Sequence, residues 1–433
     1  MSSGALGGFR ARSPSEGKVS TVALWRTWRT KGRRDEGRAH GTLSCSLGQN
    51  PSLSDPGARN GNVARAHQPP LDNFPPTQSS VQGFSSRPDA RNMPTETITV
   101  TPTPTWVPLK IEGLVPAPYR TPKFNLRVVP LHPTFACELQ GVDWSKDVSP
   151  ELYQEIREIV DKYGVVVCRK TGLTDEAHIK FSANFGDLDD VKPYQKAGRT
   201  HRLAYPELFD AGNIDPNTGD VAPLTAAQVI GNKANELFHV DSSFNGRRAG
   251  HSLLLAHVLP PPGTGGSTEY ADSRTAYDEL PDATKKQIEG LVANHSLFHS
   301  RKTVMPEYFK DTDPSKLPLS KHKLSQTHEW SGRKNLYIAS YVHSIEGLDD
   351  AASKALIAEL LAHVQQPRYR VTIDWHQPGD MIMWDNTSVM HRATGGSYEG
   401  QHRRDMRRTT VKDMSRDKYG LNGDGADWRV GLP

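Results

Sequence analysis

The sequence predicts an α+β fold with a mainly β core: a double-stranded β-helix, or jelly roll, with helices packed on its outside. Two observations predict it. Helical periodicity appears early in the folded part of the chain, and strand-sized apolar runs separated by proline and glycine follow it. Many short strands in one chain are typical of a sandwich or barrel.

The composition divides the chain of 433 residues into unequal parts. Residues 1–95 are rich in Ser, Gly, Pro, Arg and Asn and show neither a helical stripe nor an alternating strand, so we predict a disordered extension. Residues 96–121 are predicted to be a linker, residues 122–415 one folded domain, and residues 416–433 a C-terminal tail. The sequence leaves open whether the stretch before Met93 belongs to the native protein.

Charge and composition restrict the partners and the location. The formal net charge is only +4, so we expect no nucleic-acid partner. We expect no membrane partner, because no apolar run is long enough to span a bilayer. The basic N-terminal extension is also compatible with an organelle transit peptide, but acidic residues interrupt it, so a cytoplasmic location is the main expectation. The oligomeric state, including a homo-oligomer, is left open.

Capping signals define the first elements of the folded part. Each of two early helices has a hydroxyl residue as N-cap and a glycine at its end, and an apolar strand lies between them. The predicted ranges are Pro150–Tyr163 for the first helix, Val165–Arg169 for the strand, and about 174–185 for the second helix.

The later elements are mostly short strands. The predicted strands are Ala227–Ile230, Leu237–Phe244, His251–Leu259, Leu336–Tyr341, Tyr369–Trp375, Met381–Trp384 and Met406–Val411. Helical insertions are predicted at about 273–280, 282–291 and 349–363.

A histidine and an aspartate two residues apart stand in the predicted strand 237–244. Residues two apart on a strand point to the same face, so His239 and Asp241 would converge on one point. His391 comes far enough along the chain to lie on an opposing strand. Two histidines and one carboxylate form the triad that binds Fe(II) in non-haem oxygenases. Alone, the His-x-Asp spacing is more often a hydrogen-bonded pair at a barrel rim.

A strongly basic strand follows His391. Strand alternation places Arg404 and Arg408 on one face and Arg403 on the other. A buried guanidinium without an anionic partner is costly, and arginine binds carboxylates through two hydrogen bonds, so inward arginines indicate anionic ligands. The alternative is a solvated basic strand at the edge of a sheet.

Seven stretches, in order, resemble the TauD/TfdA family of Fe(II)- and 2-oxoglutarate-dependent dioxygenases. The resemblance covers roughly residues 125–412 and is closer to the 2,4-dichlorophenoxyacetate type. The stretches are FSANFGDL at 181–188, VIGNKANELFHVDSSF at 229–244, GGST at 265–268, SGRKNLYI at 331–338, HSIEGL at 343–348, GDMIMWDNTSVMH at 379–391, and the basic strand 403–410.

The resemblance implies that His239, Asp241 and His391 hold Fe(II), with 2-oxoglutarate and O₂ as cosubstrates. It implies hydroxylation of a small anionic organic substrate, such as a carboxylate or sulfonate, with succinate and CO₂ as co-products. Some hydroxylated products of this kind then break a bond. Related halogenases lack the carboxylate ligand, so the retained Asp241 argues against halogenation.

The resemblance also assigns residues to the two organic molecules. Thr268 and Arg404 match the family's ligands for the distal carboxylate of 2-oxoglutarate, and Arg408 matches the residue that meets the substrate's anionic group. The loop from His391 to Arg404 looks slightly longer than is usual in the family, so Arg403 remains the alternative for the cosubstrate.

Two functions from other classes stay open. One is a jelly roll that binds a small molecule without turnover, and the other is a zinc-dependent hydrolase, although the sequence has no His-Glu-x-x-His motif. The substrate is undetermined. Lys192, Lys196 and Arg199 lie in the stretch that corresponds to a substrate-pocket loop, and they are either anion contacts or solvated charges.

Overall fold

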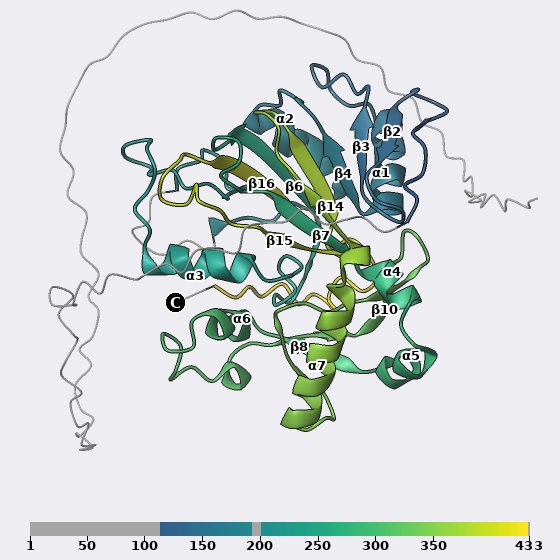
Figure 1. Ribbon diagram of the computed structural model, residues 1–433, viewed down its shortest axis with the longest axis vertical. Coiled ribbons are helices and arrows are strands. Elements are labelled where there is room, and N and C mark those ends of the chain that lie inside the picture. Colours follow the sequence, from purple (N-terminus) through teal and green to yellow (C-terminus); the bar gives the residue numbers. More distant parts are fainter. Residues whose placement is uncertain (1–112, 193–200, 432–433) are drawn as a thin grey trace, which may run out of the picture. The chain divides into compact units, whose positions relative to one another are not determined.

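The computed structural model describes residues 113–192 and 201–431 (Figure 1). The predicted disordered extension, residues 1–95, lies outside the described residues, as do Lys196 and Arg199. The described residues form a mixed sheet and helix protein, in which a large sheet carries helices on one face and a smaller sheet on the other.

The large sheet has eight strands in the order β1-β2-β3-β4-β14-β6-β16-β5. Neighbouring strands run antiparallel, except that β3 and β4 are parallel. The bounds are β1 Tyr119–Arg120, β2 Arg127–Pro130, β3 Cys137–Gln140, β4 Val165–Cys168, β5 Leu208–Asp210, β6 Ala249–Val258, β14 Met381–Asp385 and β16 Asp405–Lys412.

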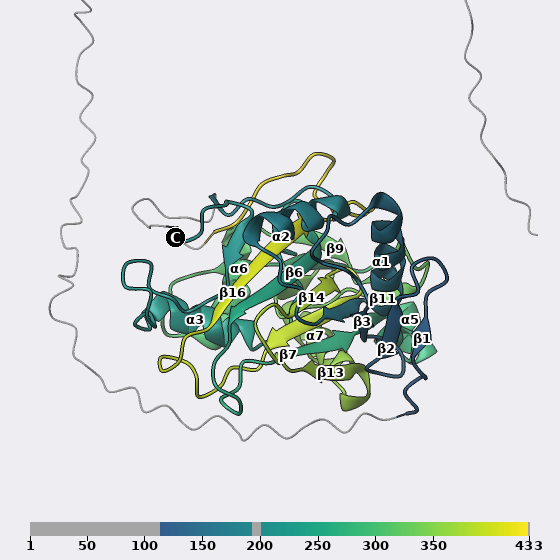
Figure 2. The same ribbon diagram turned by 90° about the horizontal axis from the view of Figure 1, so that it is seen from above.

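Two helices cover the outer face of this sheet, α1 (Pro150–Tyr163) and α2 (Asp175–Ser182), as Figure 2 shows. The predicted N-caps are confirmed: the hydroxyl oxygens of Ser149 and Thr174 each accept a backbone N–H of the first helical turn. A 3₁₀ turn at Ala183–Phe185 extends α2. Alternate residues of β6 and β14 pack beneath these helices, and apolar burial holds the layers together.

The smaller sheet has the order β13-β7-β15 and packs against the inner face of the large one. Its strands are β7 Thr268–Asp272, β13 Arg370–Ile373 and β15 Val389–Ala393. Tyr270 and Val389 from this sheet share one buried cluster with Leu254, Trp384 and Met406 from the large sheet. The two sheets therefore face each other, but in the part of the chain that the structure describes they do not close into a barrel.

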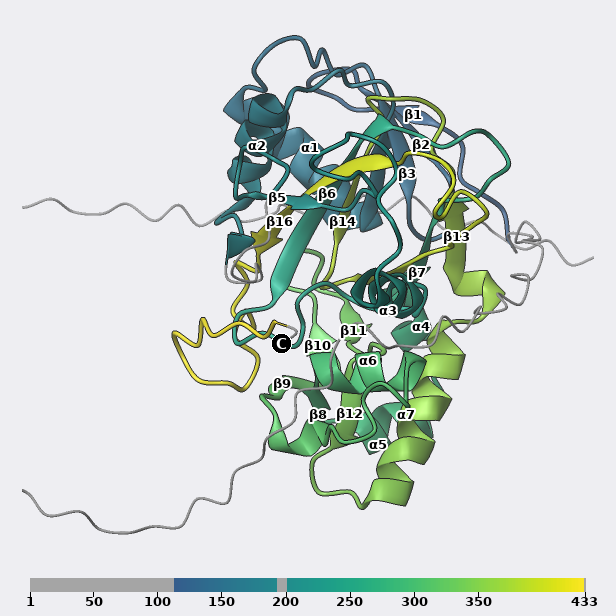
Figure 3. The ribbon, with the colours of Figure 1, turned by 90° about the vertical axis from the view of Figure 1, so that its left-hand side faces the viewer.

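The remaining elements form a third region, seen in the lower half of Figure 3. A buried apolar cluster contributed by α4, α7, β11 and β12 holds it together. The bounds are α3 Ala226–Asn235, α4 Ser273–Asp278, α5 Asp282–Ile288, α6 Leu297–Val304, α7 Asp350–Val364, β8 Val292–His295, β9 Ser320–Lys323, β10 Ser325–Thr327, β11 Lys334–Leu336 and β12 Val342–Ile345. Short 3₁₀ turns lie at Pro314–Lys316 and Pro367–Tyr369.

Four predicted strands were wrong or too long, and one of them, Tyr369–Trp375, is a strand only over Arg370–Ile373. Ala227–Ile230 lies in helix α3, because Thr225 and Gln228 form a capping box that begins a helix there. The predicted strand 237–244 is reduced to one bridge residue, His239, and a turn with Ser242 at φ 53° follows. Only the start of the run 336–341 belongs to a strand. Short apolar runs do not distinguish strands from buried helix or irregular chain.

The ends of the predicted domain also carry structure. Tyr119 and Arg120, in the predicted linker, pair with β2. In the predicted tail, Val430 is buried and its N–H donates to the side chain of Asn245. None of the helices in the described ranges has the length and apolar character needed to cross a membrane.

Gly164 provides a test of packing behind β14 and β15. It ends α1 at φ +71°, and a Cβ atom there would lie 2.8 Å from Cγ1 of Val389. We expect Gly164→Ala to lower the free energy of unfolding by about 2 kcal/mol or more, from backbone strain plus overpacking. Urea denaturation measures this loss.

Gly172 is the matched control. It has φ +66° but no heavy atom within 4 Å of an added Cβ, so Gly172→Ala should cost only about 1 kcal/mol of strain. Equal losses in the two variants would contradict the packing argument.

Candidate active site

The backbones of two histidines are hydrogen-bonded to each other at the centre of the site. The N–H of His239 donates to the carbonyl oxygen of His391 at 2.9 Å, and the N–H of His391 donates to the carbonyl oxygen of His239 at 2.8 Å. His391 lies in β15, so His239 continues the small sheet by one residue. The ring centroids are 4.3 Å apart, and both side chains are buried.

Asp241 completes a buried triad with these histidines. One ligand atom from each of His239, Asp241 and His391 can be chosen so that all three lie within 4.8 Å of one another. Nε2 of His391 is 3.7 Å from Oδ2 of Asp241. The structure thus brings together the three residues that the sequence proposed as metal ligands, although the strand expected around His239 is only a bridge.

The protonation states suit a divalent cation. Burial lowers the pKa of both His239 and His391, which keeps their imidazoles neutral. Burial alone would raise the pKa of Asp241, but Arg408, the two histidines and Ser252 lower it to about 2. Nδ1 of His239 lies 2.7 Å from the carbonyl oxygen of Leu237 and must donate to it, so Nε2 keeps its lone pair. Two neutral imidazoles and one carboxylate fit a 2-His-1-carboxylate metal site.

Two polar side chains fix the orientation of Asp241. Ser252 on β6 donates its hydroxyl to Oδ2 of Asp241 at 2.7 Å, and the side-chain oxygen of Asn386 accepts the Asp241 N–H at 2.9 Å. Asn386 also donates to Ser252 at 3.0 Å and accepts from the indole of Trp384 at 3.1 Å. Both residues are fully buried, so the carboxylate is held by groups that cannot rotate toward solvent.

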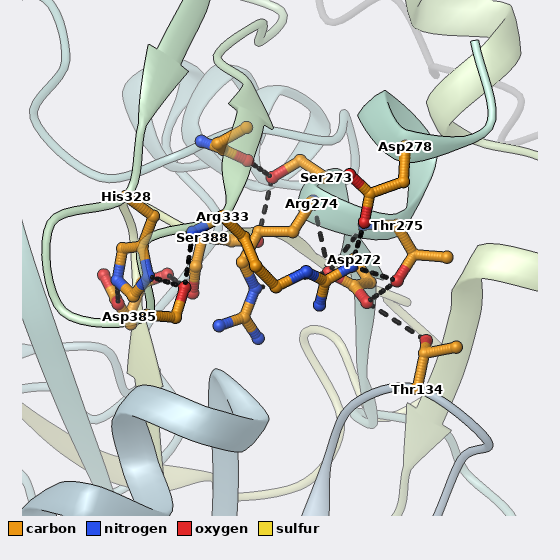
Figure 4. Close-up of polar contacts among 12 residues, drawn as sticks. Thr134, Asp272, Ser273, Arg274, Thr275, Asp278, His328, Arg333, Asp385 and Ser388 are labelled. Atoms are coloured by element: carbon orange, nitrogen blue, oxygen red, sulfur yellow. Dashed lines mark hydrogen bonds and ion pairs between the residues drawn. The ribbon is translucent and has the colours of Figure 1, made fainter. Parts of the chain in front are cut away.

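A second polar network holds the turn between β14 and β15 that carries Asn386 (Figure 4). Asp385 pairs with His328 at 2.7 Å, and its other oxygen accepts from Thr387. The carbonyl of Ser388 accepts from the hydroxyl of Ser273 at the start of α4. The turn is therefore tied to the third region as well as to both sheets.

The triad opens into a cavity of about 1000 Å³. Its walls come from the two sheets, α3, α6 and the segment 201–225, and they are partly aromatic. Phe209, Phe244 and Tyr341 are among the lining residues. The cavity can hold an organic molecule next to the triad.

Arg404 and Thr268 both line this cavity, as the sequence-based assignment requires. Arg404 donates to the carbonyl oxygens of Ala211 at 3.1 Å and Gly266 at 3.4 Å, and its buried Nε has no hydrogen-bond partner in the described ranges. Arg403 instead donates to the carbonyl of Gly219 in an exposed position and does not line this cavity.

Arg408 also lines the cavity, but it already has an acidic partner. Its Nη1 donates to Oδ1 of Asp241 at 2.8 Å, and its guanidinium lies 4.7 Å from the ring centroid of Phe209. The strand that carries it is not an edge strand, because β16 lies between β6 and β5. The alternative of a solvated basic edge is therefore wrong for this face.

The sequence analysis missed several residues of the site. Ser252 and Asn386 gave no signal by themselves, although Asn386 lies in a stretch that carried the family resemblance. Arg301 on α6 and Tyr341 also line the cavity. Arg301 lies in a helix that the sequence did not predict, so no periodicity indicated its direction. Lys192, one of the three basic residues considered as anion contacts, is exposed and does not line the cavity.

Comparison with known proteins shows the family to which the chain belongs. Residues 127–410 match the family described as "Taurine catabolism dioxygenase TauD, TfdA family". The chain belongs to the TauD/TfdA family. It is 38% identical to alpha-ketoglutarate-dependent 2,4-dichlorophenoxyacetate dioxygenases from Burkholderia sp. (strain RASC), over 65% of this chain and 92% of that one, and from Cupriavidus pinatubonensis, over 66% and 96%.

A solved structure shows the same relationship. The crystal structure of AAD-2 in complex with Mn(II) and N-oxalylglycine matches with a TM-score of 0.61 and 34% identity, over 67% of this chain and 98% of that one. The predicted TauD/TfdA membership and the predicted dioxygenase class are confirmed by these matches.

In this TauD/TfdA protein, the Ser252 hydroxyl is expected to matter for metal affinity. Ser252→Ala removes the hydrogen bond to Oδ2 of Asp241, and loss of a group that orients a ligand costs about 10-fold or more in affinity. Isothermal titration calorimetry of the metal-free protein with Mn(II) measures the change in affinity.

Ser182→Ala is the matched control. Ser182 is as buried as Ser252, but its hydroxyl contacts His178 and Thr409 on the outer side of the large sheet. It should leave the Mn(II) affinity unchanged. The same affinity in wild type and Ser252→Ala would show that Asp241 does not need this hydrogen bond.

Proposed function

We propose that the chain is an Fe(II)- and 2-oxoglutarate-dependent dioxygenase that hydroxylates a small anionic organic substrate, releasing succinate and CO₂. The observation that carries the proposal is the buried triad of His239, Asp241 and His391, opening into a cavity that also contains Arg404. The family of the chain supports the same reaction class.

His239, Asp241 and His391 would hold the iron. When bound, Fe(II) with 2-oxoglutarate and O₂ supplies the oxidant for a C–H bond. The protein's own part is to supply neutral imidazoles and an ionised carboxylate, and to keep that carboxylate oriented through Ser252 and Asn386.

Arg404 and Thr268 would bind the distal carboxylate of 2-oxoglutarate. The buried, unpartnered Nε of Arg404 and the burial of Thr268 support this role, because an N–H group shielded from water binds a carboxylate strongly. Arg403 is the weaker alternative, since its guanidinium contacts Gly219 in an exposed position. A zinc hydrolase would have no need for an arginine and a threonine placed for a dicarboxylate.

The walls of the cavity indicate the kind of substrate. Arg408 would meet its anionic group, and Phe209 and Phe244 provide surface for an apolar body. The named substrate of the Burkholderia and Cupriavidus relatives, 2,4-dichlorophenoxyacetate, has this combination of carboxylate and aromatic ring. A small carboxylate, sulfonate or similar anion is therefore the proposed substrate class.

We also propose that residues 122–415 form the catalytic domain and that its core is a double-stranded β-helix. The two sheets that face each other across Leu254, Tyr270 and Trp384 would be its two halves. The N-terminal part of the chain up to residue 112 lies outside the described residues.

An anaerobic titration tests the reaction class. Addition of Fe(II) and then 2-oxoglutarate to the metal-free protein should produce the weak visible charge-transfer band of a chelated keto acid. His239→Ala should abolish the band, because it removes one buried imidazole of the triad. A wild-type protein that binds neither Fe(II) nor 2-oxoglutarate would bring the zinc-hydrolase and non-enzymatic alternatives back.

A pair of adjacent substitutions tests the cosubstrate assignment. Arg404→Met should raise the dissociation constant of 2-oxoglutarate at least about 10-fold, since a hydrogen bond to a charged group is worth roughly 1.5–3 kcal/mol. Arg403→Met should change it little, because that side chain lies outside the cavity. The titration of the same absorption band measures both, and the reverse order of effects would move the role to Arg403.

A further inference from the structure

Arg301 is a basic residue in the cavity that the proposed mechanism has not yet used. It lies on α6, whereas Arg408 lies on β16 of the large sheet and Arg404 directly precedes that strand. Figure 3 shows α6 in its lower half and the large sheet above it. Nε and Nη1 of Arg301 are both buried and have no hydrogen-bond partner in the described ranges. These two N–H groups therefore lack the hydrogen bonds that buried polar groups need.

Arg301 lies close to the triad. Burial raises the pKa of the Tyr341 phenol, and the nearby charge of Arg301 opposes the rise. The ring of Tyr341 is itself 5.9 Å from that of His239, centroid to centroid. A group bound to Arg301 would therefore be held near the reacting end of the cavity.

Two other arginines of the cavity have acidic partners. Arg202 pairs with Asp210 at 2.7 Å, and Arg408 pairs with Asp241 at 2.8 Å. In the ranges 113–192 and 201–431, no carboxylate lies within 4.0 Å of Arg301 or of Arg404. Arg404 is assigned to the distal carboxylate of 2-oxoglutarate. Arg301 is thus the cation left for the other organic molecule.

The charges in the loaded cavity lead to the same conclusion. Fe(II) and 2-oxoglutarate carry opposite double charges, and Asp241 offsets one guanidinium. Of the three arginines Arg301, Arg404 and Arg408, the first two have no acidic partner within 4.0 Å in the described ranges, and Arg404 is assigned to 2-oxoglutarate. An anionic substrate would pair with Arg301, whereas a neutral one would leave its charge without a counter-ion.

We propose that Arg301 is a specificity-determining residue, which contacts the anionic group of the organic substrate from the α6 side and so selects anions over neutral molecules. This inference rests on the proposed function. Arg301 and Tyr341 line the same cavity, and the buried, unpartnered Nε and Nη1 of Arg301 are the two donors for the anion. Arg408 would contact the same anion from β16 while remaining next to Asp241.

The test uses the full chain loaded with Fe(II) and 2-oxoglutarate. A panel of aryloxyacetates, arylsulfonates and alkyl sulfates, including 2,4-dichlorophenoxyacetate, is screened with wild type by succinate release and by perturbation of the charge-transfer band. The best anionic probe and its neutral counterpart, the amide for a carboxylate, are then compared in the variants. If the wild-type protein forms the band but binds no anion of the panel at millimolar concentration, the inference fails and the proposed function stands.

Arg301→Met should raise the KM or dissociation constant of the anionic probe about 10-fold or more and leave that of the neutral probe nearly unchanged. Arg301→Lys should recover part of the loss. The charge-transfer band and the 2-oxoglutarate affinity should stay within twofold of wild type in both variants, which shows that they fold and keep the metal site.

Lys302→Met is the matched control on the same helix. The ammonium of Lys302 donates to the carbonyl oxygens of Lys310 and Thr312, outside the cavity, so its loss should not change selectivity. Equal effects of Arg301→Met on the acid and the amide, or no effect on either, would overturn the inference. A missing band in wild type would instead refute the proposed function.

Discussion

The reciprocal backbone hydrogen bonds between His239 and His391 are the constraint on which the rest of the site depends. They join the chain after α3 to strand β15, and no other regular pairing holds His239 in place in the described ranges. Because both imidazoles are attached to this one bridge, their separation is set by backbone geometry. Asp241 needs a separate support, and Ser252 and Asn386 supply it from the large sheet and from the β14–β15 turn.

Alternation along β16 and the residues just before it sends arginines to two sides of the large sheet. Arg404 and Arg408 line the cavity, while Arg407 points outward and pairs with Asp175 on α2. Arg407 has two permanent acidic partners, Asp175 and Asp405, so its charge contributes to packing between the sheet and α2. On the cavity side, Arg404 has no acidic partner in the described ranges. Arg408 pairs with Asp241, which is itself a candidate metal ligand. One strand thereby serves both the outer layer and the cavity.

The polar network behind the β14–β15 turn explains why so many buried polar groups are compatible with this core. Asp385 is fully buried, but it pairs with His328 and accepts two hydrogen bonds from Thr387. A satisfied network of this kind is rigid, whereas a half-satisfied one is destabilising. The rigidity is transmitted to Asn386, which adjoins Asp385 and fixes the backbone of Asp241.

The sequence by itself determined the elements with local signals and the chemical identity of the candidate ligands. Helix α1 begins and ends where Ser149, Pro150 and Gly164 predicted, because capping is a local interaction. The roles of the triad, Thr268 and the inward arginines stay predictions, but strand alternation placed Arg404 and Arg408 on the cavity side as observed.

Only the tertiary structure decided the backbone around His239, the pairing of Arg408 with Asp241, and the direction of Arg301. Each depends on contacts between segments that lie far apart in the sequence. Local propensity and periodicity do not predict such contacts.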